Sequence, residues 1–122
     1  MKLSDKQLED LLLKSFDYLD KVKEACKVTI SQCMQSEDLN RANSLIRSCM
    51  ETMDTSDLCK FFIINKSPNT KNCVAFTLKV LKTNEKECEK LFNDKTCKDM
   101  AKFCHKLIKE TSDILLKLHD GI

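Results

Sequence analysis

The sequence predicts an all-α protein, an antiparallel up-down-up-down four-helix bundle that forms a single domain over residues 1–122. Three observations predict this fold. The chain has one glycine and one proline, too few for the tight turns that join β-strands. Apolar residues recur at spacings of three, four and seven, which is the helical period. The links between the periodic stretches are only a few residues long, and short links join antiparallel neighbours.

The first two helices are predicted at residues 5–35 and from residues 36–38 to about Asn65. Ser4 and Gln7 form a capping box that starts the first helix. The apolar stripe of the first helix contains Leu8, Leu12, Leu19, Val22, Cys26, Ile30 and Cys33, and that of the second contains Leu39, Ala42, Ile46, Cys49, Met53 and Ser56. These stripes predict which faces turn toward the core.

The third and fourth helices follow a clear boundary at Ser67 and Pro68. Serine caps helices, and proline suits the first helical position because its missing N–H would be unpaired there. We expect the fourth helix to begin at residues 93–94 and to end at Gly121. The stripe of the third helix is Val74, Leu78, Leu81 and Cys88, and that of the fourth is Cys97, Met100, Cys104, Leu107, Ile108, Leu115 and Leu118.

Composition argues against several classes of protein. The net charge is +2 and the basic residues form no block, so nucleic acid is not an expected partner. No stretch approaches the roughly 20 apolar residues of a membrane helix, so no membrane partner is expected either. Acidic residues interrupt the apolar run of residues 1–14, which is therefore a poor secretory signal. We expect a cytoplasmic protein.

The eight cysteines are the most informative feature of the chain. Counting residues from the end of the bundle that holds the first and third links sorts them by depth, at about 1.5 Å per residue. The predicted layers are Cys33, Cys88 and Cys97 near that end, Cys26, Cys49 and Cys104 in the middle, and Cys59 and Cys73 farthest in. Each layer draws on different helices, so any site must be built across helices.

Thiolates in layers of two or three suit Cu(I), with Zn(II) the less favoured ion. Met53 and Met100 lie four residues from Cys49 and Cys104, so each shares a helix face with a cysteine. His105 follows Cys104 and is a further candidate ligand. Two alternatives stay open. The cysteines could form disulfides between helices, or they could pack as small apolar side chains in the core of a structural or interaction module.

Three segments of the chain resemble the cysteine-rich four-helix copper storage proteins of bacteria, especially the cytosolic branch. They are residues 33–37, residues 56–59, and Glu87 to Lys90 followed by the seven-residue step from Cys97 to Cys104. The resemblance covers about residues 22–110. It implies a bundle whose thiolates hold several Cu(I) ions, with His and Met residues at the mouth and assembly into homotetramers. The implied ligands are Cys26, Cys33, Cys49, Cys59, Cys73, Cys88, Cys97 and Cys104.

This chain departs from the family pattern because it has fewer cysteines and no CxxxC pair. Near positions where cysteine is expected stand Thr29, Thr55, Leu81, Met100 and Leu107. The departure leaves open a reduced store, a sensor or chaperone with few sites, or a relative that has lost metal binding.

The sequence does not predict an enzyme. It has no CxxC motif, no Ser/His/Asp set and no Gly-rich phosphate loop. Cys97 is expected in the first turn of the fourth helix, where the helix dipole would favour its thiolate. A thiol oxidoreductase would also need a resolving cysteine nearby, and none lies two residues on. The leading hypothesis is a non-catalytic protein that sequesters or buffers Cu(I).

Overall fold

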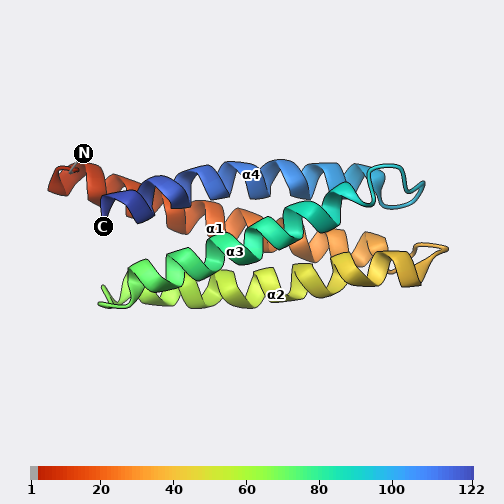
Figure 1. Ribbon diagram of the computed structural model, residues 1–122, viewed down its shortest axis with the longest axis horizontal. Helices are drawn as coiled ribbons and strands as arrows, with labels where there is room; N and C mark the ends of the chain where they lie inside the picture. Colours follow the sequence, from red (N-terminus) through yellow and green to blue (C-terminus); the bar gives the residue numbers. More distant parts are fainter. Residues whose placement is uncertain (1–2) are drawn as a thin grey trace.

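The computed structural model describes residues 3–122 and confirms the predicted all-α bundle. Its four helices are α1 (Asp5–Cys33), α2 (Leu39–Ile64), α3 (Thr70–Glu89) and α4 (Lys98–Gly121). Each helix packs against two neighbours, α1 and α3 both lying between α2 and α4. Both termini lie at one end of the elongated bundle, together with the α2–α3 turn, and the other two turns lie at the opposite end (Figure 1).

The first two helices begin where polar side chains satisfy their free backbone N–H groups. The Ser4 Oγ accepts from the Gln7 N–H at 3.2 Å, and the Gln7 Oε1 accepts from the Ser4 N–H at 2.9 Å. This confirms the predicted capping box. The Asp38 Oδ1 accepts from the Arg41 N–H at 3.1 Å and caps α2 in the same way.

Two helix starts differ from the prediction. Pro68 lies in the turn before α3, because the Ser67 Oγ accepts from the Asn69 N–H at 3.0 Å and holds a turn there. The start predicted at residues 93–94 belongs to an irregular segment, and α4 begins only at Lys98. The Asp94 Oδ1 accepts from the N–H groups of Thr96 and Cys97, each at 2.9 Å, which stabilises turns in place of a helix.

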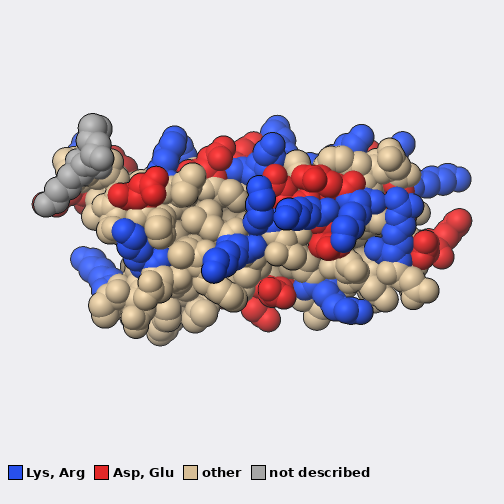
Figure 2. All heavy atoms as spheres, in the orientation of Figure 1, with Lys and Arg blue, Asp and Glu red and all other residues tan. Residues whose placement is uncertain are grey.

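The core runs along the axis of the bundle and changes character along its length. Toward the α1–α2 turn it is lined by thiols, and toward the termini it is filled by Leu19, Ile108, Leu115 and Leu118. On the face in Figure 2, lysines and arginines are intermixed with acidic residues, so no single-sign block is visible there. None of the described helices is long and apolar enough to cross a membrane.

Candidate metal centre

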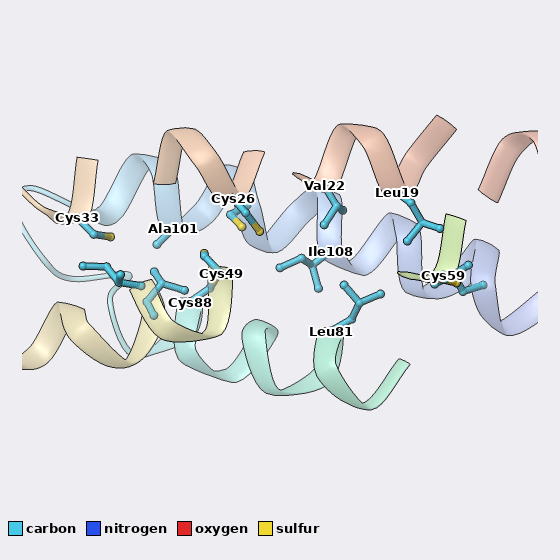
Figure 3. Packing of buried hydrophobic residues seen from close by; sticks show 14 of the residues in the cluster. Leu19, Val22, Cys26, Cys33, Cys49, Cys59, Leu81, Cys88, Ala101 and Ile108 are labelled. Atoms are coloured by element: carbon cyan, nitrogen blue, oxygen red, sulfur yellow. The ribbon is translucent and has the colours of Figure 1, made fainter. Parts of the chain in front are cut away.

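Three buried sulfur atoms converge near the middle of the bundle. The Sγ atoms of Cys26 on α1, Cys49 on α2 and Cys104 on α4 lie within 4.8 Å of one another. None of the three residues is exposed to solvent. Figure 3 shows Cys26 and Cys49 directed toward each other across the core. These are the three cysteines that the depth count assigned to the middle layer.

The third helix contributes a buried amide to this cluster. The Asn84 Nδ2 donates to the Thr52 Oγ1 at 2.8 Å, and it lies 3.7 Å from the Cys49 Sγ and 3.9 Å from the Cys26 Sγ. The Asn84 Oδ1 accepts from the Cys88 Sγ at 3.2 Å. Asn84 therefore contacts the three-sulfur group on one side and Cys88 on the other. We did not identify this residue from the sequence, although an amide on the apolar stripe between Leu81 and Cys88 was a signal that could have found it.

The pKa values of Cys26, Cys49, Cys88 and Cys104 are shifted in different directions. Hydrogen bonds from Cys26, Cys49 and Cys88 lower the pKa of Cys104. The pKa values of those three thiols are raised, chiefly because each is hydrogen-bonded to Cys104 and because burial disfavours a thiolate. Because thiolate is the ligand form, a cation that binds these thiols would release protons.

A pair of thiols lies at the end of the bundle that holds the α1–α2 turn. Burial raises the pKa of the Cys33 thiol to about 12, with a further contribution from its neighbour Cys97. The expectation that the Cys97 thiolate would be favoured is wrong. Cys97 is the N-cap residue of α4, and burial, followed by the nearby Asp94 carboxylate, raises its pKa above the ordinary value.

A second pair, Cys59 and Cys73, lies in the other half of the bundle. Burial raises the pKa of Cys59 to about 12, and Cys73 is its nearest thiol neighbour. Val22, Leu81 and Ile108 fill the core between this pair and the three-sulfur group (Figure 3). These aliphatic side chains offer no ligand atoms, so the row of sulfur atoms along the axis is interrupted there.

The predicted layers are thus correct in part. The middle three cysteines and the far pair lie as the depth count placed them. Cys88 differs, because its thiol reaches Asn84 and Cys104 in the middle of the bundle. Counting helical rise gives the depth of a Cα atom, whereas the side chain leans along the helix by several ångströms.

The three predicted metal ligands that are not cysteines lie at separate places in the bundle. Met53 is half-buried and packs against the core. Met100 is half-buried in the first turn of α4. The structure places the imidazole of His105 on the outer side of α3 and α4, where its Nε2 lies 2.9 Å from the Glu89 Oε2. All eight cysteines are free thiols, and all are buried.

Of three comparisons with known proteins, one gave a match. The searches of curated proteins and of solved structures found none. The family model described as copper storage protein matches residues 9–115. That range includes every cysteine and parts of all four helices. The bundle, its buried free thiols and this match together show that the chain belongs to the copper storage protein family.

Proposed function

We propose that this protein sequesters or buffers Cu(I) through cysteine thiolates inside the bundle. The observation that carries this proposal is the convergence of the Cys26, Cys49 and Cys104 sulfur atoms within 4.8 Å of one another. Soft thiolates favour Cu(I), and a buried site shields the ion from water. The family match supports copper as the ion.

The number of sulfur atoms favours Cu(I) over Zn(II). Structural zinc sites are almost always tetrahedral, with four protein ligands. Here three sulfur atoms converge, and the fourth thiol, Cys88, is hydrogen-bonded to Asn84 at 3.2 Å. A site limited to three thiolates suits the lower coordination number that we expect for Cu(I). The pairs Cys33/Cys97 and Cys59/Cys73 offer two-sulfur sites of the same kind.

A titration of the reduced, metal-free protein with Cu(I) in the presence of a competing chelator tests the proposal. We expect more than one tightly held ion per chain. Replacing Cys26, Cys49 and Cys104 by serine should remove the contribution of the three-sulfur group and leave that of the two pairs. The matched control is the Cys59→Ser, Cys73→Ser double variant, which should lose only the contribution of the far pair. Fewer than one tightly held ion per wild-type chain would end the proposal.

The proposal also covers the cellular location, the partners and the assembly of the protein. We propose a non-catalytic protein of the cytoplasm, where thiols stay reduced, without a nucleic-acid partner. We also propose assembly into a homo-oligomer, with a tetramer as the first candidate. Support comes from large apolar side chains that are about half exposed on α2 and α3, namely Met50, Leu58, Phe61, Ile64 and Phe76. Light scattering of the purified protein measures the mass of the assembly.

A further inference from the structure

A second group of ligand-type side chains lies on the outer side of α3 and α4. Glu85 and Glu89 on α3 and His105 on α4 each place one ligand atom within 4.8 Å of the others. The His105 Nε2 is 2.9 Å from the Glu89 Oε2 and 4.0 Å from the Glu85 Oε1. This group contains no sulfur, and the copper proposal does not use it.

The helices bring these three groups together for simple geometric reasons. Glu85 and Glu89 are four residues apart, so both carboxylates lie on one face of α3, where they repel each other. His105 approaches from the adjacent helix, and the Phe92 ring packs edge-on against its imidazole with 5.0 Å between the ring centroids. The imidazole is therefore held in place from one side while its Nε2 faces the carboxylates.

The charges of the group leave room for a cation. Within residues 3–122, His105 is the only ion-pair partner of Glu85 and of Glu89. A neutral imidazole can donate through Nε2 to one carboxylate oxygen only. Glu87, on the same helix, instead pairs with Lys90 at 2.9 Å. Two carboxylates that share one imidazole thus keep several unused lone pairs that face one another.

We propose that Glu85, Glu89 and His105 form a binding site for a divalent cation of the Mn(II) to Zn(II) series. One imidazole nitrogen and two carboxylate oxygens are ligands for such ions, and the set contains none of the soft sulfur ligands that select Cu(I). The Glu85 and His105 side chains are 16% and 17% exposed, which fixes two ligands. The Glu89 side chain is 50% exposed and can swing to close the site. Water would complete the coordination.

The residues of this site are sequence neighbours of residues in the thiol core. Glu85 follows Asn84, Glu89 follows Cys88, and His105 follows Cys104. Consecutive residues of a helix point about 100° apart. The same turns of α3 and α4 therefore direct Asn84, Cys88 and Cys104 toward the core and place the carboxylates and the imidazole on the outer side. An ion bound outside would link α3 to α4 at the level of the three-sulfur group.

A Mn(II) titration of the reduced, metal-free protein, followed by electron paramagnetic resonance, tests the site. Mn(II) is chosen because it prefers oxygen and nitrogen ligands to thiolates. We expect one bound Mn(II) per chain. Glu89→Gln should weaken binding at least tenfold, and the Glu85→Gln, Glu89→Gln double variant should abolish it.

Two matched controls separate this site from general charge effects. Glu87→Gln removes a glutamate from the same helix turn, and His119→Ala removes the other histidine, which lies 3.7 Å from one carboxylate, that of Asp120. Both variants should bind Mn(II) like the wild type. Wild-type protein that binds no Mn(II), or a Glu89→Gln variant that binds as tightly as Glu87→Gln, would overturn the proposal. Cu(I) capacity should be unchanged in all four variants, so the test is independent of the copper sites.

Discussion

The two halves of the bundle share the same four helices but have different core residues. The half nearer the α1–α2 turn contains six of the eight cysteines together with Asn84. The half nearer the termini contains mostly leucine and isoleucine, with the single pair Cys59 and Cys73. The comparison teaches that candidate ligands are concentrated at one end of a core that is continuous along the axis. Leu45 and Leu91 are also buried in the thiol half, so aliphatic packing stabilises both halves while most of the thiols lie in one.

The largest expected effect concerns the aliphatic half. Leu115 is fully buried in α4, and its replacement by alanine should lower the free energy of unfolding by about 2–5 kcal/mol, because a cavity is left in the core. Urea denaturation of the reduced protein measures the change. The control is the next residue, Leu116, which is 52% exposed. If Leu116→Ala cost as much as Leu115→Ala, the loss could not be assigned to burial in the core.

Alkaline pH should destabilise the metal-free protein. The pKa values of Cys33 and Cys59 are about 12 in the folded chain, against 9.0 for an unperturbed thiol. The folded chain therefore keeps these protons at pH values where the unfolded chain has lost them. The stabilisation is complete below pH 9 and is lost as the pH rises toward 12.

Urea midpoints measured on both sides of pH 9 check this dependence. Because Cys33 and Cys59 belong to different halves, Cys33→Ser and Cys59→Ser compare the halves directly. Each variant should flatten the alkaline slope in part. A slope that neither substitution changes would contradict the assignment of these protons.

Asn84 offers a test of metal preference in the thiol half. Asn84→Leu removes the acceptor of the Cys88 thiol, which lies at 3.2 Å, and should free a fourth sulfur atom for the cluster. Because Zn(II) favours four ligands, its affinity relative to that of Cu(I) should rise about tenfold, or about 1.4 kcal/mol. Competition titrations measure the ratio. Asn72→Leu, an exposed position on the same helix, is the control, and an unchanged ratio in Asn84→Leu would rule out this role.

The smallest expected effect lies on the outer surface of the aliphatic half. The Lys23 Nζ lies 2.9 Å from the Asp57 Oδ2 and lowers the pKa of that carboxyl group. Because the pair is partly exposed, Asp57→Asn should cost only about 0.2–1 kcal/mol, measured by urea denaturation at low salt. Asp54→Asn, at an exposed position one turn away, should cost less. A loss as large as that of Leu115→Ala would show that this surface, too, stabilises the bundle.

The helices and much of the core could be predicted from the sequence, because helical periodicity and caps are local signals. The same is true of the three-sulfur group, since depth along a helix follows from counting residues. The start of α4 was missed because the Asp94 side chain competes with the helix for backbone N–H groups. The place of Cys88 beside Asn84 and the pairing of His105 with Glu89 depend on side-chain direction across helices, which periodicity does not contain.

Threonine hydroxyls are buried in both halves of the core, and the hydrogen bonds that they donate are local. Thr29, Thr52, Thr77 and Thr111 each donate to the carbonyl oxygen four residues earlier, at 2.7 to 2.8 Å. None of these donors needs a partner on another helix. Apart from Thr52, which also accepts from the Asn84 Nδ2, a threonine and a cysteine of similar size can therefore replace each other during evolution without leaving an unpaired polar group. Such a core can gain or lose one thiol at a time, so the number of sulfur atoms can change in single steps while the bundle keeps its shape.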